Sequence, residues 1–358
     1  MKKKILYMIF LPYPSAVVRA TIFKDLLEAD EYDVTYYYNY SVALTKLQDF
    51  LKRSGFALLD FPLQILQKVI VYIKIRMLMA SIRKFDAVIL IKYVKAAWIT
   101  SLKRKFKGKI LYDFDDAVWL PNLMGMSEFE NVVRSVDYVS TDNHYLKSAA
   151  EVHNINTFVV NGPCQVELFD EYHPKERSDK DTIVIGWIGS AETVLYLYAI
   201  YDALEEIGSR YSRVILRLVG SGYDKSLIPM FEKIKVETIP TYNQTEMIRH
   251  VKSFDIGIFS LFRNSLSLGR GILKATIYMA GGVPVVCSAF GDNTKIIVDG
   301  DNGFLANNTD EWVSKLSRLI DDPNLRRTMG DSGHEWAKAN LSIRLCYQQL
   351  KTNFLNSI

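Results

Sequence analysis

Residues 269–304 read GRGILKATIYMAGGVPVVCSAFGDNTKIIVDGDNGF, and they carry the clearest structural signal in the chain. The Gly-led first half has the spacing of a helix that carries Arg270 and Lys274, and a pair of glycines ends it. A short apolar strand through Val286 follows, and then a return rich in Gly and Asp. Helix starts attract anions, because their free N–H groups and the helix dipole both favour negative charge. The stretch therefore predicts a strand-and-helix module of an α/β sheet with an anion site at a cationic helix start.

Strand-like and helix-like segments alternate along the rest of the chain. The β-rich or apolar runs begin near residues 5, 34, 87, 110, 138, 158, 183, 214, 236 and 256. Segments with helical spacing lie between most of them, including one near residues 227–234, and this alternation builds parallel sheets covered by helices. The chain is therefore expected to be an α/β protein.

The length of 358 residues allows two α/β domains, each with its own hydrophobic core. The run PKERSDKD at residues 174–181 is polar and charged and has no hydrophobic period, which indicates a linker. We therefore expect a Rossmann-like domain over residues 1–170, a second over residues 171–340, and a C-terminal helix over residues 341–358.

Several common types of site are disfavoured. The three cysteines are far apart and have no CxxC or His-rich neighbours, so neither a disulfide framework nor a zinc site is indicated, and a reducing cytosol is expected. No GxGxxG motif follows the first strand of either half, and no GK[ST] phosphate loop occurs, which disfavours dinucleotide oxidoreductases and P-loop enzymes. The opening MKKKILYMIF is interpreted as a first strand, because prolines and no small-residue cleavage site follow it. Two Rossmann-like halves without either motif favour a ligand held between domains.

Charge is distributed unevenly. Residues 1–109 hold 20 Lys and Arg against 8 Asp and Glu, whereas the rest of the chain holds 24 against 32. The basic third indicates an anionic partner, either a membrane surface or a phosphorylated substrate; an ordinary solvated basic face is the alternative.

Residues 62–84, PLQILQKVIVYIKIRMLMASIRK, predict an apolar helix with interspersed basic residues. Lys74 and Arg76 lie in its middle, which argues against a membrane span. One interpretation is a helix in the interface of an anionic membrane, and peripheral membrane contact is the corresponding hypothesis. The other is a core-facing helix whose basic side chains reach out to solvent.

Polar residues follow two strands of the first half. We expect Arg19 in the first turn of a helix over residues 17–27, beside the carboxyl end of the first strand, where parallel sheets bind ligands. Arg19 is therefore a candidate acceptor-binding residue, with a plain surface arginine as the alternative. The segment YDFDDAVW places Asp113, Asp115 and Asp116 where another strand ends. Such carboxylates can act as a general base, bind sugar hydroxyls or cap the next helix; no His or further carboxylate cluster accompanies them, so no metal site is predicted.

These motifs together resemble the GT-B glycosyltransferases, in particular the large retaining family 4. The resemblance rests mainly on YMAGGVPVV at residues 278–286 and DGDNGFL at residues 299–305. Supporting matches are IGWIGS at 185–190, LVGSG at 218–222, YDFDD at 112–116, NGP at 161–163 and the segment 311–333. The similarity spans essentially the whole chain.

The resemblance implies two Rossmann-like domains that face each other across a cleft, with a nucleotide-sugar donor on the second domain and an acceptor on the first. It implies transfer with retention and without a metal or other cofactor. Arg270 and Lys274, expected on one helical face, would neutralise the departing nucleoside diphosphate. Asp115 or Asp116 would contact the acceptor or the transferred sugar. The expected donor-binding groups are Gly189, Ser190 and the backbone of Gly271, Ile272 and Leu273.

One departure from family 4 concerns two glutamates that bind the sugar and the ribose. Gly269 and Ile277 stand at the corresponding positions here, so the donor cannot be identified. A nucleotide-sugar epimerase of the same fold and a non-catalytic homologue acting as a partner subunit stay open as alternatives. The leading hypothesis is a cytoplasmic hexosyltransferase-type enzyme that extends a glycan or lipid-linked saccharide of an envelope polysaccharide. The inner face of the cell membrane is the more specific location that this hypothesis includes. No nucleic-acid partner is expected.

Overall fold

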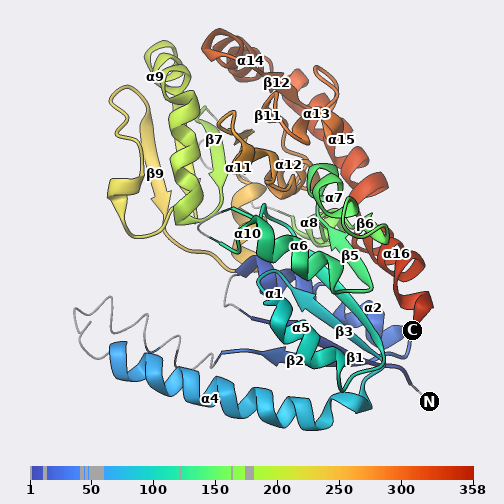
Figure 1. The fold of residues 1–358 in the computed structure, drawn as a ribbon. Coiled ribbons are helices and arrows are strands. Elements are labelled where there is room, and N and C mark those ends of the chain that lie inside the picture. Colours follow the sequence, from blue (N-terminus) through green and yellow to red (C-terminus); the bar gives the residue numbers. More distant parts are fainter. Residues whose placement is uncertain are drawn as a thin grey trace. The chain divides into compact units, whose positions relative to one another are not determined.

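The computed structural model describes residues 2–10, 14–40, 44, 47, 60–120, 123–162, 164–173 and 181–358. The chain forms two compact units (Figure 1), one made of Met1–Val160 with Tyr347–Ile358 and the other of Asn161–Cys346. The linker expected at residues 174–181 lies outside the described residues except for its last position, and so does Pro163 of the NGP motif.

The first unit is a parallel sheet of six strands with helices around it, in the order β2-β1-β3-β4-β5-β6. The strands are β1 (Lys4–Ile9), β2 (Asp33–Tyr38), β3 (Ala87–Ile91), β4 (Lys109–Phe114), β5 (Tyr138–Thr141) and β6 (Thr157–Val159). The helices are α1 (Pro14–Thr21), α2 (Lys24–Ala29), α4 (Asp60–Ser81), the short η2 (Ile82–Lys84), α5 (Ala96–Lys103), α6 (Met126–Arg134) and α7 (His144–Glu151). The chain leaves β1 toward one edge of the sheet and β3 toward the other, so the topological switch point lies between these two strands.

The second unit contains another parallel six-stranded sheet, in the order β12-β11-β10-β7-β8-β9. Its strands are β7 (Ile183–Ile188), β8 (Val214–Val219), β9 (Lys235–Ile239), β10 (Ile256–Phe259), β11 (Val285–Ser288) and β12 (Phe304–Ala306). Its helical segments are α8 (Val166–Glu171), η3 (Ala191–Ile200), α9 (Tyr201–Arg210), η4 (Lys225–Leu227), α10 (Gln244–Val251), α11 (Ser265–Leu268), α12 (Leu273–Ala280), α13 (Asn293–Ile296), α14 (Thr309–Asp321) and α15 (Pro323–Leu341). The switch point of this sheet lies between β7 and β10.

The first unit ends at Val160 and not near residue 170, because α8 belongs to the core of the second unit. Val166 and Phe169 on α8 are buried in the same apolar cluster as residues of α12 and β11. At its other end the chain returns to the first unit in the course of α16 (Ile343–Asn353), which is followed by the short η5 (Leu355–Ser357).

The returning segment is fixed to the first unit by both polar and apolar contacts. The Tyr347 hydroxyl donates a hydrogen bond of 2.7 Å to Asp30, and the Lys351 ammonium forms an ion pair of 2.6 Å with the same carboxylate. Phe354 is fully buried, and its ring centroid lies 5.5 Å from that of Tyr138. The last residues therefore complete the core of the first unit.

The helix expected over residues 17–27 is wrong, because the structure divides it into α1 and α2. Thr21 donates its hydroxyl hydrogen to the carbonyl of Val17, a side-chain bond that bends helices. Arg19 consequently lies in the last turn of α1 and not in a first turn.

Two further helix predictions are corrected. The helix expected near residues 227–234 is absent, since the short η4 ends at Leu227 and Pro229, which has no N–H to donate, follows. The Gly-led helix expected from Gly269 begins only at Leu273. Glycine is a poor helix former, and the segment between α11 and α12 forms a turn.

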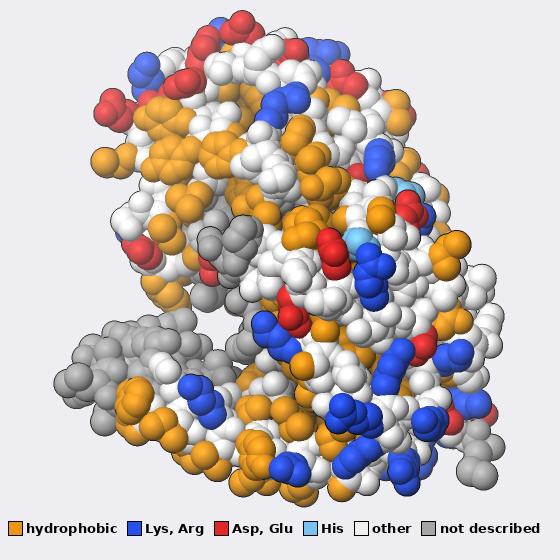
Figure 2. Space-filling model, in the orientation of Figure 1, with side chains coloured by type: hydrophobic (Ala, Val, Ile, Leu, Met, Phe, Trp, Pro, Cys, Tyr) orange, Lys and Arg blue, Asp and Glu red, His pale blue; other side chains and the backbone are white. Residues whose placement is uncertain are grey.

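Helix α4, with 22 residues, is the longest helix in the described part of the first unit, and Figure 2 shows hydrophobic side chains exposed along it. None of the helices in the described part of the chain is long and apolar enough to cross a membrane.

Replacing Phe354 by alanine tests whether the returning segment holds the first unit together. We expect the free energy of unfolding to fall by about 3–5 kcal/mol, because a fully buried aromatic ring is lost and a cavity remains. Chemical denaturation followed by circular dichroism measures this. The neighbouring exposed change Gln348→Ala is the matched control; equal stability of both variants would contradict the prediction.

Candidate functional site

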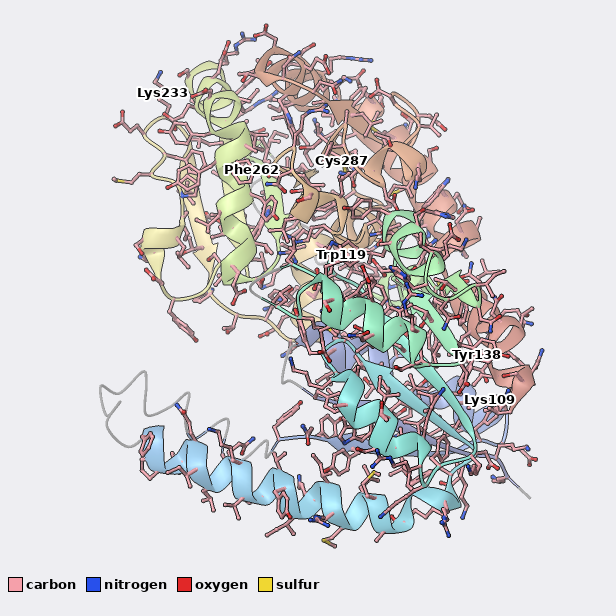
Figure 3. The ribbon with its side chains drawn as sticks, in the orientation of Figure 1. Lys109, Trp119, Tyr138, Lys233, Phe262 and Cys287 are labelled. Atoms are coloured by element: carbon pink, nitrogen blue, oxygen red, sulfur yellow. The ribbon has the colours of Figure 1, made fainter. Side chains whose placement is uncertain are left out.

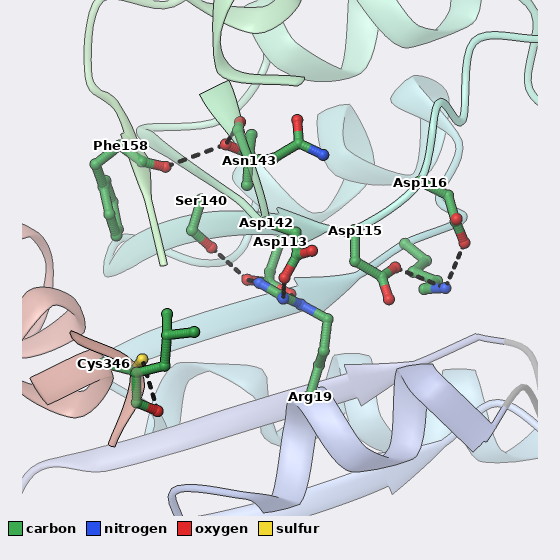
Figure 4. Close-up of polar contacts among 12 residues, drawn as sticks. Arg19, Asp113, Asp115, Asp116, Ser140, Asp142, Asn143, Phe158 and Cys346 are labelled. Atoms are coloured by element: carbon green, nitrogen blue, oxygen red, sulfur yellow. Dashed lines mark hydrogen bonds and ion pairs between the residues drawn. The ribbon is translucent and has the colours of Figure 1, made fainter. Parts of the chain in front are cut away.

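Each unit carries a group of charged residues at the carboxyl ends of its strands. In the first unit the group comprises Arg19, Lys92, Asp113, Asp115, Asp116 and Asp142, called the first-unit charge cluster below (Figure 4). Arg19 comes from the helix after β1, Lys92 directly follows β3, the Asp113–Asp116 segment ends β4, and Asp142 follows β5. Parallel strands bring these positions to one edge of the sheet, next to its switch point.

Arg19 holds the inner part of the cluster. Its guanidinium donates two hydrogen bonds to the Asp113 carboxylate, at 2.6 and 2.8 Å, and a third to Asp142 at 2.9 Å. The Arg19 side chain is only 9% exposed. Burial alone would lower the pKa of Arg19, but the charge of Asp113 and the hydrogen bonds with it raise that pKa above its ordinary value. A bidentate pair of this kind joins α1 firmly to the ends of β4 and β5.

Asp142 is the most enclosed carboxylate of the cluster. Burial raises the pKa of Asp142 to about 7, and the charge of Arg19 opposes this shift. The sequence-based hypothesis that Arg19 binds the acceptor stays a prediction. The observed geometry shows that Arg19 has a structural task, since its guanidinium already binds Asp113 and Asp142.

Lys92 holds the outer part of the cluster. Its ammonium lies 2.6 Å from an Asp115 oxygen and 2.9 Å from an Asp116 oxygen. The backbone of Lys92 has φ = +60°, which is unfavourable for a residue with a side chain. A hydrogen bond from the Lys92 N–H to the Asp113 carbonyl, 2.7 Å long, holds this conformation. Strained residues of this kind are concentrated at functional sites.

Asp115 and Asp116 are the members of the cluster that reach solvent, with side chains 16% and 23% exposed. Burial raises the pKa of Asp115, and the charge of Lys92 opposes this shift. The loop that carries them is anchored by Trp119, labelled in Figure 3, whose ring packs against Phe129 at 5.0 Å between centroids. Carboxylates fixed in this way can accept hydrogen bonds from sugar hydroxyls.

The His, Cys, Asp and Glu side chains of the described residues are the groups that could bind a metal ion. Among them no group of three or more His, Cys, Asp or Glu side chains is arranged to hold a metal ion. The carboxylates of the Asp113–Asp116 segment instead form ion pairs with Arg19 and Lys92.

In the second unit, Lys274 in the first turn of α12 lies over the switch point of the sheet. Its ammonium is 4.5 Å from the ring centroid of Trp187 on β7 and 5.8 Å from that of Phe259 on β10. It donates a hydrogen bond of 3.1 Å to the hydroxyl of Thr193. A Cβ on Gly189 would lie 2.7 Å from the Trp187 ring and 2.8 Å from this ammonium, so a side chain there would displace the ring, the amine or both. Burial, and then the nearby charge of Arg270, lower the pKa of Lys274 to about 7.

Arg270 lies near Lys274 but not on the same helix. It belongs to the turn before α12, and its guanidinium carbon is 5.9 Å from the ring centroid of Tyr196. The expectation that both cations lie on one helical face is therefore wrong, because Arg270 precedes α12. Their proximity nevertheless holds, because the charge of Arg270 acts on Lys274.

The predicted donor-binding backbone groups divide between the helix and the turn. Thr276 donates the first hydrogen bond of α12, to the Ile272 carbonyl. Leu273 is therefore the first residue of the helix, and its N–H is one of the groups that form the positive end of the helix dipole. Gly271 and Ile272 precede the helix. Ser190 caps the start of η3, where its N–H donates to the Thr193 hydroxyl at 3.1 Å.

Tyr278 and Gly220 fix the surroundings of this site. The Tyr278 hydroxyl accepts a hydrogen bond from the Ile188 N–H at 2.9 Å and donates one to the Ile258 carbonyl at 3.2 Å. It thereby ties α12 to the ends of β7 and β10. Gly220 has φ = +81°, and a Cβ there would lie 2.1 Å from the Gly189 carbonyl oxygen, so the loops after β7 and β8 meet closely.

Sequence reasoning missed Lys92, Asp142, Trp187 and Thr193. Lys92 and Asp142 each follow the last residue of a short buried strand, and this position could have identified them. Trp187 lies within an apolar strand, and no sequence signal distinguishes it from a core residue.

Comparisons with known proteins show which proteins this chain resembles. Residues 182–322 match the family model described as Glycosyl transferases group 1. An uncharacterised glycosyltransferase of Methanocaldococcus jannaschii is 30% identical over 166 residues, which are 42% of this chain and 43% of the relative. The capsular polysaccharide biosynthesis glycosyltransferase CapM of Staphylococcus aureus is 23% identical over 195 residues, 52% of this chain and 49% of the relative. The chain thus spans less than half the length of either curated relative.

Among solved structures, Anabaena HepE in complex with UDP and glucose has a TM-score of 0.67 at 15% identity, covering 99% of this chain and 100% of that chain. This likeness concerns the fold. The two parallel six-stranded sheets with flanking helices are the architecture of the GT-B glycosyltransferases. The chain accordingly has an α/β fold of the GT-B type and matches the glycosyl transferases group 1 model over residues 182–322.

The substitution Arg19→Ala tests whether the arginine stabilises the fold, which a residue that only binds an acceptor would not do. We expect it to lower the free energy of unfolding by about 3–5 kcal/mol, because it leaves two buried carboxylates without their cation. Urea denaturation measures the change. The exposed Lys24→Ala, on the next helix, is expected to cost under about 1 kcal/mol. Wild-type stability of Arg19→Ala would show that the cluster does not support the fold.

Lys274 makes a specific pH dependence of anion binding testable. A diphosphate bound beside Lys274 would need the protonated amine, so the affinity for UDP would then fall by about tenfold per pH unit above pH 7 until the amine of the complex itself loses its proton. Titration calorimetry between pH 6.5 and about 9 measures this. Lys274→Met should remove the slope, and a slope that persists in that variant would contradict the assignment.

The free protein should show the opposite trend in stability. The pKa of Lys274 is lower in the folded state than its ordinary value of 10.5, so the unfolded chain binds more protons between these two values. The contribution of Lys274 to the free energy of unfolding therefore rises with pH from about 7 to about 10. Comparing wild type with Lys274→Met in denaturation experiments across this range isolates it.

Proposed function

We propose that this chain is a glycosyltransferase of the retaining family 4, which transfers a sugar from a nucleoside-diphosphate sugar to a saccharide acceptor. The observation that carries the proposal is the pair of cations, Arg270 and Lys274, next to Gly189 and the start of α12. They lie at the switch point between β7 and β10, where open α/β sheets bind their ligands.

The chemistry of this group suits a diphosphate leaving group. When the bond between the sugar and the diphosphate breaks, negative charge grows on the phosphate oxygen. A protonated Lys274, the Arg270 guanidinium and the N–H groups at the start of α12 stabilise such charge. Because these groups are protein cations and dipoles, we propose that transfer does not depend on a metal ion.

The comparisons support the donor class. The matched segment 182–322 contains Gly189, Ser190, Arg270 and Lys274. The structural neighbour HepE was solved with UDP, with UDP and glucose, and with UDP-glucose. We propose a nucleotide sugar of this kind as the donor, with Gly271, Ile272 and Leu273 supplying backbone contacts, and a hexosyl group as the transferred sugar.

For the acceptor we propose a glycan or lipid-linked saccharide of envelope polysaccharide synthesis. Asp115 and Asp116 are assigned to bind its hydroxyls or those of the transferred sugar, because Lys92 fixes both carboxylates while part of each remains exposed. The S. aureus relative, whose name concerns capsular polysaccharide biosynthesis, supports this class. We also propose a cytoplasmic location, which the three free, buried cysteines fit.

Donor binding is tested first. The purified protein is incubated with UDP-, GDP- and TDP-sugars and with the free nucleoside diphosphates, and its melting temperature is recorded. We expect at least one of these ligands to raise the melting temperature, since binding stabilises the folded state. No shift with any of them would overturn the donor site and favour a non-catalytic homologue.

Turnover of the donor that binds is tested next. Arg270→Ala and Lys274→Ala should each lower turnover by roughly 10²–10³-fold, because each removes a charge from the leaving-group site, whereas Arg249→Ala, an exposed change on α10, should leave it unchanged. EDTA should have no effect, and NMR of the product should show a retained anomeric configuration. Conversion of the donor without any acceptor would instead indicate an epimerase.

A further inference from the structure

The outward side of α4 is apolar. Its exposed large hydrophobic residues are Phe61, Ile65, Leu66, Val69, Tyr72, Ile73 and Met77. They recur at intervals of mostly three and four residues, so they form one continuous face of the helix, called the α4 face below. Phe61 and Met77, near its two ends, are 70% and 68% exposed. A contiguous exposed apolar strip of this length is unusual for a protein that only contacts water.

The opposite side of α4 attaches the helix to the first unit. Leu78 and Ile82, which follow at the end of α4 and in η2, are buried in the apolar cluster that also contains residues of β3 and β4. The Lys74 ammonium donates to the Tyr40 carbonyl at 3.4 Å. The helix is therefore packed through one side and presents apolar side chains on the other. It combines features of both sequence-based interpretations, the core-facing helix and the helix in a membrane interface.

Basic residues lie within the α4 face and beyond its C-terminal end. Arg76 lies within it, with its guanidinium over the Tyr72 ring at 5.3 Å and a hydrogen bond of 2.8 Å to the Tyr72 hydroxyl. At the end of α4, Arg83 donates to the Lys105 carbonyl at 3.3 Å, which places η2 beside the segment between α5 and β4. The basic residues of η2 and of residues 103–109 are Arg83, Lys84, Lys103, Arg104, Lys105, Lys107 and Lys109.

The charge of this part of the molecule is strongly one-sided. Residues 60–109 contain 12 Lys and Arg and two acidic residues. Figure 2 shows blue side chains gathered on the first unit to one side of the orange strip along α4, and Figure 3 labels Lys109 in that region. An apolar strip bordered by lysine and arginine matches the chemistry of an anionic bilayer surface, which offers acyl chains below a layer of phosphates.

We propose that the α4 face lies in the interfacial layer of an anionic lipid bilayer. The helix lies parallel to the membrane plane, with Phe61, Ile65, Ile73 and Met77 inserted at the boundary between headgroups and acyl chains. Arg76, Lys84 and the lysines before β4 bind lipid phosphates. Tyr72 and Arg76 suit this position, because one end of each side chain is apolar and the other polar. At about 1.5 Å per residue, the 22 residues of α4 provide a strip about 33 Å long.

This inference does not depend on the proposed transfer reaction. Membrane binding is measured with the full chain alone, without donor or acceptor, so its failure leaves the donor-site experiments unaffected. If both hold, the membrane brings the first unit to the surface where a lipid-linked acceptor is found.

Vesicle flotation tests the proposal. The full-length protein is mixed with vesicles of phosphatidylcholine containing phosphatidylglycerol, and with vesicles of phosphatidylcholine alone, at low and at physiological salt. We expect binding to the anionic vesicles that weakens as salt rises, because phosphate contacts are screened. Ile73→Glu and Met77→Glu should each weaken partitioning by about tenfold or more, since a charged side chain cannot enter the apolar layer at low cost.

Ile155→Glu is the matched control, because Ile155 is 92% exposed on the same unit but outside α4. All these positions are exposed, so the variants should fold, and circular dichroism checks this. As a second measurement, Met77→Cys is labelled with a polarity-sensitive dye; the three native cysteines are buried and should not react. The dye emission should shift to the blue with anionic vesicles, and a dye on Ile155→Cys should not respond.

Three results would overturn the proposal. The first is no binding to anionic vesicles at low salt. The second is binding that Ile73→Glu and Met77→Glu leave unchanged. The third is a dimer in light scattering that Met77→Glu dissociates while the wild type ignores vesicles, which would assign the α4 face to a second copy of the chain.

Discussion

In both units the strands of the sheet run in one direction, so each sheet has a single edge at which every strand ends. A residue that directly follows a strand is brought to that edge regardless of its distance along the chain. In the first unit Lys92 and Asp142 directly follow strands, and Asp113 lies near the end of β4. Arg19, on the helix after β1, reaches the same edge, although 123 residues separate it from Asp142. In the second unit the same constraint brings Gly189, which follows β7, to the β7 and β10 strand ends over which Lys274 lies. The direction of the strands thus sets where the charged groups lie, and burial and neighbouring charges set their pKa values.

The two charged groups are held by different means. In the first unit Arg19 and Lys92 form ion pairs with carboxylates, and these ion pairs offset the free energy needed to remove the charges from water. In the second unit Lys274 and Arg270 lie over the rings of Trp187 and Tyr196. Rings attract cations more weakly than carboxylates do. Burial and the charge of Arg270 lower the pKa of Lys274 to about 7. The first arrangement favours a fixed framework, whereas the second holds the Lys274 ammonium by aromatic rings and the Thr193 hydroxyl.

The parallel α/β pattern could be predicted from the sequence, because a buried parallel strand such as AVILI at β3 is a continuous apolar run. Gly189 and Lys274 could be found from motifs, and the structure places them together. The exact start of α12 could not be predicted from the sequence. The glycines at 269 and 271 lower the helix propensity only slightly, so tertiary contacts decide whether the helix includes them. Helices α6 and α15 were also not recognised as separate elements, although α15 begins with Asp322 capping and Pro323, a strong start signal.

Partners in space were the harder problem. Nothing in the local sequence indicates that Arg19 binds Asp142 or that Tyr278 bonds to two strands, because these contacts depend on the sheet order. The apolar run of α4 was visible, but its division into a packed and an outward side depends on where the helix meets the first unit.

The return of Tyr347–Ile358 to the first unit has a consequence for how the chain acquires its structure during synthesis. The second unit is one uninterrupted segment, Asn161–Cys346, whereas the first unit is made from two segments that flank it. Domains usually fold in the order in which they leave the ribosome. Here the core around Tyr138 lacks Phe354 until the end of this sequence has emerged, so the unit that begins first is the one completed last.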